Sequence, residues 1–292
     1  MNLKEKIKLF APPFLIDLAR RLQSELSSRA EWEYIPEGWD YARSHPEIKG
    51  WNVQDVLEAY QQKWPQFVAM INGAGPLGLT HESNLDSDQD IISHNIMMSF
   101  AYTLTLASRM KERISVLDWG GGIGHYYLLA RTLLPEVEID YHCKDVPILC
   151  RHGTQLFPKQ HFYEDESCLG NTYDFVVAST SMHYTEDWSS LLLKLAQATS
   201  GYLYIANLPI VMQSSSFVFV QRPYRYGYNT EYLAWCLNRN ELLRTAERGN
   251  LTLIREFIGG HRPYIKQAPE QNLYRGFLFA VTPERGHETR IK

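Results

Sequence analysis

VLDWGGGIGH, residues 116–125, is the stretch of sequence that decides the fold. An apolar, β-branched run ends on a carboxylate, Asp118, and glycines then occupy alternate positions in the pattern D-x-G-x-G-x-G. Glycine has no Cβ, so such a loop lets the backbone approach a bound ligand closely. A dinucleotide loop needs G-x-G-x-x-G, but the sixth position counted from Gly120 is His125. The loop therefore predicts a nucleoside site of a different kind from that of the NAD enzymes.

Short apolar runs alternate with helical patterns on both sides of this loop. Strand-like runs occupy residues 114–118, 137–143, 161–163, 175–178 and 202–206, and two more follow at 251–257 and 276–281. Helical patterns lie at 124–134, from 147 onward and at 188–198, and this alternation is typical of βαβ units. The sequence predicts an α/β fold with a mostly parallel sheet and helices on both of its faces. Ligands of such folds bind in the loops beyond the carboxyl ends of the strands.

The chain of 292 residues is longer than a typical single domain. Residues 1–110 are predicted to form an N-terminal helical cap, since a helical pattern at 53–67 lies among loops rich in Trp, Pro and Gly. Residues 111–292 are predicted to form the nucleoside-binding domain. Within it, residues 211–243 are expected to be a loop-and-helix insertion that acts as a lid.

The amino-acid composition and the missing motifs argue against several classes of function. The formal net charge of −4 gives no overall positive field for nucleic acid, so no nucleic-acid partner is expected. Cysteines are scattered without any C-x-x-C pair, which disfavours a zinc site or a disulfide framework and suits reduced thiols in a cytoplasm. His142, His152 and His161 lack the i, i+4 spacing of a helical metal site, so no metal is predicted. The absence of a G-x-S-x-G elbow disfavours a hydrolase.

Residues 1–29 form a locally basic, amphipathic end in a chain that is acidic overall. Their apolar stretch is short and no small-residue cleavage site follows it, so a signal peptide is not predicted. A segment of this kind can lie on an anionic membrane surface or on a partner, and it can also pack on its own domain. We expect a cytoplasmic protein, with peripheral membrane contact through this segment as an option.

Taken together, these motifs resemble those of the class I S-adenosylmethionine-dependent methyltransferases, over roughly residues 114–281. The resemblance implies a Rossmann-like fold with a seven-stranded sheet, S-adenosylmethionine as methyl donor and S-adenosylhomocysteine as product. It also implies that Asp145, at the end of the second strand, receives both ribose hydroxyls, for which two acceptor oxygens are well suited. The alternative role for Asp145 is a helix cap ahead of Pro147.

Other cofactor contacts follow from the same resemblance. Asp165, after the third strand, is placed where the family recognises the adenine amino group, although a solvated loop charge would look the same. Ser179 lies at the end of the fourth strand, in the loop that faces the methyl donor in this family. The predicted cofactor-binding residues are Asp118, Gly120, Gly122, Gly124, His125, Asp145, Val146, Asp165 and Ser179.

Methyl transfer is an in-line displacement, so positioning supplies much of the rate and a general base is optional. His183, just after the fourth strand, is predicted to act as base or to orient the acceptor, and the alternative is a loop histidine bonded to backbone. Tyr184 is predicted to orient the acceptor hydroxyl. The predicted acceptor-binding residues are Tyr126, Tyr228, Trp235 and Asn238, whose alternative role is in an aromatic core.

A narrower resemblance involves DWGGG at 118–122, DVP at 145–147, STSMHY at 179–184, LP at 208–209 and the stretch 229–243. These segments are similar to methyltransferases often met in bacterial surface-polysaccharide loci. Asp145 stands where that family commonly has glutamate, and His183 where it often has glutamine. We therefore expect O-methylation of a sugar or glycan-pathway intermediate. A small natural product as acceptor, and a non-catalytic S-adenosylmethionine-binding regulator, are the alternatives.

Overall fold

The computed structural model describes residues 30–79, 90–260 and 262–282. The basic segment 1–29, and with it the predicted membrane or partner docking, lies outside these residues. Within the described part of the chain, no helix combines the length and apolar character needed to cross a membrane.

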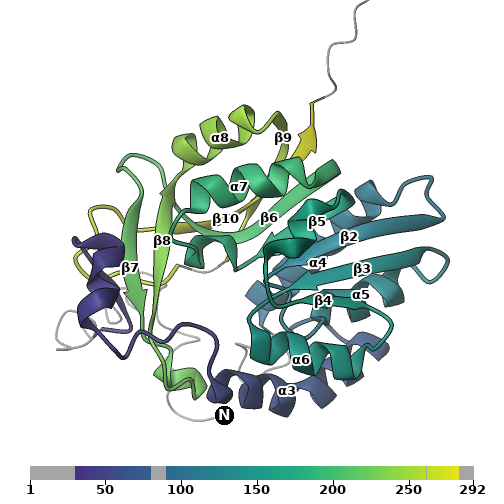
Figure 1. Cartoon of the computed structure of the whole chain (residues 1–292), viewed down its shortest axis with the longest axis horizontal. Coiled ribbons are helices and arrows are strands. Elements are labelled where there is room, and N and C mark those ends of the chain that lie inside the picture. The colour runs from purple at the N-terminus through teal and green to yellow at the C-terminus, as the bar shows by residue number, and fades with distance from the viewer. Residues whose placement is uncertain (1–29, 80–89, 261, 283–292) are drawn as a thin grey trace, which may run out of the picture.

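One twisted sheet organises the molecule (Figure 1). Its parallel centre consists of β2 (Arg113–Trp119), β3 (Glu138–Lys144), β4 (His161–Tyr163), β5 (Tyr173–Ser179) and β6 (Thr199–Val211). These strands lie in the order β6-β5-β2-β3-β4, so the chain reverses its direction across the sheet beside β2. The carboxyl ends of β2 and β5 meet at this switch point, where open α/β sheets bind their ligands.

The predicted Rossmann-like α/β fold is confirmed in the parallel centre of the sheet, but the predicted number of seven strands is wrong. Over the described residues 30–79, 90–260 and 262–282, the sheet has ten strands and is mixed. Five strands lie outside the parallel centre: β1 (Trp32–Tyr34), β7 (Phe217–Gln221), β8 (Tyr232–Asn238), β9 (Leu251–Ile258) and β10 (Leu273–Val281). β10 is antiparallel to both β6 and β9, and β7 is antiparallel to β1 and β8.

Two of the additional strands arise from residues 211–243, which were expected to be loop and helix. The run FVFVQ of β7 and the run YLAWCLN of β8 are rich in aromatic and β-branched residues and are almost wholly buried. Such composition favours strands. Both faces of these strands are covered, so the alternation that marks a half-exposed strand is missing from the sequence.

Helices pack on both faces of the sheet, as predicted. One face carries α4 (Ile91–Ala107) and α5 (His125–Leu133), and the other carries α7 (Trp188–Gln197) and α8 (Arg239–Arg248). The other α-helices in the described part of the chain are α3 (Gln54–Asn72), which packs on α5, and α6 (Pro147–Leu156), which packs on β4. Side-chain caps fix the starts of three helices: Asp90 caps α4, Asp187 caps α7 and Asn238 caps α8.

A buried charge cluster ties β1 to the β7–β8 pair. The Arg222 guanidinium, 5% exposed, contacts Glu33 at 2.8 Å and Glu231 at 3.2 Å and donates to the carbonyl of Ala30 at 2.7 Å. Tyr224 donates its hydroxyl to the other oxygen of Glu231. Because buried charges are stable only when paired, this cluster fixes how the N-terminal strand joins the sheet.

We predict that Arg222→Met lowers the free energy of unfolding by about 3–5 kcal/mol, because it leaves the buried Glu231 carboxylate without its cation. The exposed pair Arg43–Asp40 provides the control, since its side chains are 80% and 69% exposed. Arg43→Met should change the same quantity by no more than about 1 kcal/mol. Urea denaturation of both variants measures the difference, and equal effects would contradict a structural role for the Arg222 cluster.

Candidate active site

A cavity of about 250 Å³ lies beyond the carboxyl ends of β2, β3 and β5. Its lining comes from the glycine loop, from the ends of these strands, from α3, α4 and α5, and from the 3₁₀ turn η3 (Met182–Tyr184). This is where the sequence predicted the nucleoside site. The strand ends and the loops after them, all far apart in sequence, supply one continuous wall.

The glycine loop forms its part of the wall with backbone, because neighbouring groups leave no room for side chains. Gly120 has φ +77° and Gly122 has φ +62°. A Cβ at Gly120 would lie 2.2 Å from the Cβ of Ser181, and one at Gly122 would lie 2.7 Å from the Tyr60 ring. Residues with side chains rarely adopt such φ values, so both conformation and space require glycine here.

Asp118 lies beneath the glycine loop and does not line the cavity. Its Oδ2 accepts a 2.6 Å hydrogen bond from the Tyr141 hydroxyl, and a Cβ at Gly121 would lie 2.3 Å from that oxygen. Its Oδ1 has no hydrogen-bond partner among the described residues. Burial raises the pKa of the Asp118 carboxyl to about 7, although the Tyr141 hydrogen bond opposes this shift. Asp118 therefore supports the loop from below.

Asp145 lines the cavity and is held by two backbone groups. Its Oδ2 accepts from the Gly122 N–H at 2.7 Å and its Oδ1 accepts from the Val146 N–H at 2.6 Å. Burial raises the pKa of the Asp145 carboxyl, while these two hydrogen bonds lower it. Each oxygen retains a second acceptor position, so the carboxylate can receive two further hydroxyl donors. Val146 is the N-cap residue of α6, and Asp145 makes no capping hydrogen bond to that helix.

Asp165 is not brought to the cavity. Its carboxylate is the N-cap of a 3₁₀ turn, η2 (Glu166–Gly170), and accepts from the Ser167 N–H at 2.9 Å. The side chain is at the surface. The structure thus places this residue in the position of a solvated, capping carboxylate.

Tyr126 and Ser179 meet in the wall of the cavity. The Tyr126 hydroxyl donates to Ser179 Oγ at 2.9 Å, and its ring stacks on Phe100 with centroids 4.1 Å apart. Burial raises the pKa of the Tyr126 hydroxyl, which keeps it protonated. His125 also lines the cavity, with its ring edge-on to Trp64 and Phe67. Burial lowers the pKa of His125 to about 3, so this ring is neutral near pH 7.

His183 and Tyr184 lie in different surroundings, and only Tyr184 lines the cavity. His183 is fully buried outside the cavity, and neither ring nitrogen has a hydrogen-bond partner in the described part of the chain. Burial lowers the pKa of His183 to about 3. Tyr184 lines the cavity and its hydroxyl donates to Gln221 at 3.3 Å. Of the two residues predicted to be catalytic, only Tyr184 is placed to touch a bound molecule.

Trp51 is an important residue of the cavity that the sequence analysis did not single out. Its ring stacks on Tyr232 with centroids 4.5 Å apart and meets the edge of Tyr184 at 5.2 Å. Backbone bonds of Gly50 fix it: its N–H donates to the Glu231 carbonyl at 3.2 Å, and its carbonyl accepts from the Thr230 hydroxyl at 2.9 Å. The start of β8 thereby holds an aromatic wall at the cavity.

Asn207 and Thr180 form a second feature of the cavity that the sequence analysis missed. Both have positive φ, +55° and +52°, which is unusual for residues other than glycine. In the pairing of β6 with β10, Ala206 and Asn207 together oppose Gly276, so a β-bulge displaces Asn207 from the regular ladder. The Asn207 amide donates to Thr180 Oγ1 at 2.9 Å, and its buried Oδ1 has no partner among the described residues.

The residues of the predicted acceptor lid, Tyr228, Trp235 and Asn238, lie outside the cavity. Tyr228 is connected to the cavity through its contact with Trp51. Tyr228 is buried with its ring 6.0 Å from that of Trp51. The Trp235 indole donates to the Glu186 carbonyl at 2.9 Å, and Asn238 caps α8. None of the three lines the cavity, whereas the fourth predicted residue, Tyr126, does. Within 224–238, Tyr228 and Tyr232 contact the Trp51 ring.

Comparison with known proteins assigns the class. A family model described as a methyltransferase domain matches residues 97–251, more than half of the 292 residues. The chain therefore belongs to the methyltransferase-domain family and is an S-adenosylmethionine-dependent methyltransferase. No curated protein matches it.

Several solved methyltransferases are similar in fold. A methyltransferase from Clostridium acetobutylicum is 11% identical, with a TM-score of 0.43 over 63% of this chain and 90% of that one. Magnesium protoporphyrin IX methyltransferase from Synechocystis is 14% identical, with a TM-score of 0.47 over 77% and 97%. An amino pentose methyltransferase from Micromonospora echinaspora is 12% identical, with a TM-score of 0.42 over 64% and 90%.

The residues that line the cavity have chemical properties suited to binding S-adenosylmethionine. The glycine loop offers bare backbone, Asp145 offers two acceptor oxygens for a diol, and the hydrophobic side chains of Val146 and Leu149 continue the wall beside it. The unpartnered Oδ1 of Asp118 lies under the same loop. These groups are the ones that could hold a nucleoside with an amino-acid tail.

The buried Asp118 makes the stability of the fold depend on pH. Its pKa is raised from 3.8 to about 7, so the folded chain keeps a proton that the unfolded chain loses above about pH 4. The stabilising contribution of Asp118 is fully present below the unfolded pKa and is lost as the pH rises through about 7.

We predict that Asp118→Asn removes this pH dependence, because asparagine has the same shape, can still accept from Tyr141 and does not ionise. The free energy of unfolding of the variant relative to wild type should therefore rise between pH 5 and pH 8. Urea denaturation at both pH values measures this difference. A constant difference across that window would show that Asp118 is not the titrating group.

Proposed function

We propose that this enzyme transfers a methyl group from S-adenosylmethionine to a hydroxyl of a small polar acceptor, a sugar or glycan-pathway intermediate. One observation carries the proposal: a single cavity joins the glycine loop and Asp145 to a wall formed by Trp51, Tyr184 and Asn207. The first half suits the cofactor and the second suits the acceptor.

On the cofactor side, Asp145 binds the two ribose hydroxyls. Its carboxylate is already oriented by the N–H groups of Gly122 and Val146, so little side-chain freedom is lost on binding. The loop from Gly120 to Gly122 lies against the amino-acid end, with Asp118 beneath it. When bound, the cofactor supplies an electrophilic sulfonium methyl group. Ser179 and Tyr126, joined by their own hydrogen bond, line the wall near this end.

On the acceptor side, the Trp51 and Tyr184 rings provide flat apolar faces, and Asn207 provides polar groups. Aromatic faces of this kind stack on the apolar side of a sugar ring, while a buried carbonyl fixes one hydroxyl. The Oδ1 of Asn207 is suited to that task because it is buried and has no partner within the described chain, and such an atom is costly unless a ligand satisfies it.

Catalysis in this arrangement comes mainly from positioning the two reactants in line. His183 does not line the cavity, so we assign it a supporting role: its ring lies 4.1 Å from that of Tyr184 and fixes where Tyr184 stands. Tyr184 and Asn207 orient the acceptor hydroxyl. The wall of hydrophobic and aromatic side chains excludes water from the reacting atoms.

We predict that Asp145→Ala weakens the binding of S-adenosylhomocysteine at least tenfold, since each lost hydrogen bond to a charged group is worth about 1.5–3 kcal/mol. Asp165→Ala is the matched control, because this exposed carboxylate does not line the cavity. Its affinity should equal that of wild type. Titration calorimetry on folded variants decides the matter: a normal affinity in Asp145→Ala, or an equal loss in Asp165→Ala, would place the ribose elsewhere.

The acceptor class is tested by incubating the protein with S-adenosylmethionine and separate panels of monosaccharides, nucleotide sugars and small phenols or amines. We expect S-adenosylhomocysteine and a product one methylene heavier with a sugar-containing acceptor. Turnover confined to the phenols or amines would favour the natural-product alternative. S-adenosylhomocysteine binding without turnover on any panel would favour a regulatory protein.

We predict that Asn207→Ala lowers kcat/KM for the identified acceptor about tenfold or more through loss of one buried hydrogen bond. Asn250→Ala is the control, because Asn250 shares the positive φ, +60° against +55°, but lies exposed and away from the cavity. Both variants carry the same backbone strain, so an equal effect on kcat/KM would rule out acceptor binding by Asn207.

A further inference from the structure

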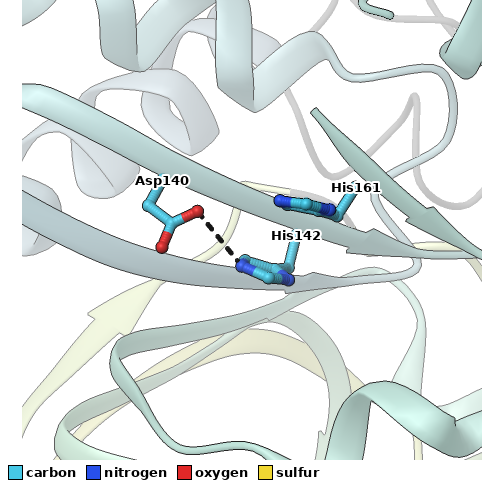
Figure 2. Close-up of side chains that lie close together, drawn as sticks. All are labelled: Asp140, His142 and His161. Carbon is cyan, nitrogen blue, oxygen red and sulfur yellow. Dashed lines mark hydrogen bonds and ion pairs between the residues drawn. The ribbon is translucent and has the colours of Figure 1, made fainter. Parts of the chain in front are cut away.

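A second group of chemically active side chains lies outside the methyl-transfer cavity, on β3 and β4. Asp140 and His142 are two residues apart on β3 and so point to the same face of the sheet. His161 is the register partner of His142 on the parallel neighbour β4, which places the two imidazoles side by side. Figure 2 shows Asp140 and His142 projecting from one strand and His161 from the next.

The potential ligand atoms of these residues converge. One ligand atom each from Asp140, His142 and His161 lies within 4.8 Å of the others. Asp140 Oδ1 is 3.2 Å from His142 Nε2, and the rings of His142 and His161 have centroids 4.5 Å apart. Bonds to a zinc ion measure about 2.0–2.2 Å, so two ligand atoms of a tetrahedral site lie about 3.4 Å apart. The three ligand atoms must therefore draw closer together when an ion binds.

Neighbouring groups orient two of these side chains. The Tyr163 hydroxyl lies 2.9 Å from His142 Nδ1, which leaves Nε2 facing Asp140. Arg113 donates to Asp140 Oδ2 at 3.1 Å, which leaves Oδ1 facing His142. Metal-binding histidines commonly have their second nitrogen fixed by such a partner. Tyr173 packs edge-on against His142 from the same face, 5.0 Å away.

We propose that Asp140, His142 and His161 bind a divalent transition-metal ion of the zinc type. Two imidazoles and one carboxylate form a recognised three-ligand set for such ions, with further positions left to water. The sequence analysis predicted no metal because it sought ligands on one helix. These ligands come from adjacent strands, and their register is a product of the fold.

The site is separate from methyl transfer. None of the three residues lines the cavity, and His142 lies three residues before Asp145, roughly 10 Å along the strand. A bound ion therefore fastens β4 to β3. β4 has only three residues and lies at the end of the parallel sheet, so a cross-strand ligand set stabilises an edge that few backbone bonds secure.

The test uses the full chain, freed of metal with a chelator and desalted, and titrates it with ZnCl₂ by calorimetry. We expect one site that is lost in His161→Ala. His152→Ala is the control, because His152 lies on α6 outside the cluster and should leave that site intact. Tyr163→Phe removes only the orienting hydroxyl and should weaken binding about 10–100-fold.

Two further measurements separate this site from adventitious binding by thiols. The visible absorption of bound Co²⁺ should be lost in His161→Ala and kept in His152→Ala. Zn²⁺ should also raise the melting temperature of wild type and not that of His161→Ala. Equal Zn²⁺ affinity in wild type and His161→Ala, or no binding to wild type, would overturn the proposal. S-adenosylhomocysteine binding, measured in parallel, shows that His161→Ala remains folded and tests the proposed function independently.

Discussion

The space under and around the glycine loop is the constraint on which this structure depends. Asp118, Ser181 and Tyr60 occupy the positions where side chains of the loop would otherwise lie. The backbone can therefore turn from β2 into α5 only as bare glycine, which leaves its flat peptide surface open to a ligand. The hydrogen bond from Gly122 to Asp145 then couples the loop to the end of β3, so one contact fixes both halves of the nucleoside site.

Several elements far from the loop act on the same cavity. The Arg222 cluster joins β1 to β7 and β8, and the start of β8 holds the backbone of Gly50. Trp51 follows directly and forms the aromatic wall. Residues 30–51 and 217–238 therefore contribute to the cavity mainly by placing one ring, and the buried charges beside Glu231 give this placement its rigidity.

Polar groups without partners mark the strained parts of the described chain. Asp118 Oδ1, Asn207 Oδ1 and both nitrogens of His183 are buried and lack hydrogen-bond partners there. Of these three residues, Asn207 lines the cavity, and it also carries a positive φ at a β-bulge. Native structures retain such costs chiefly at functional sites, where a ligand satisfies the group or strain orients it. His183 is different, since it does not line the cavity and its ring lies 4.1 Å from that of Tyr184.

The sequence alone determined the parallel centre of the sheet and the glycine loop that lines the cavity together with Asp145, because these depend on local patterns. A strand, a carboxylate and spaced glycines are contiguous in residues 116–125, and the next strand end follows in order. Only the tertiary structure decided strands β7 and β8, which pair antiparallel with each other and whose almost wholly buried runs lack a periodic signal. It alone brought Trp51, Asn207 and the Asp140 cluster into place, since strand register and bulges join residues that no spacing in the sequence relates.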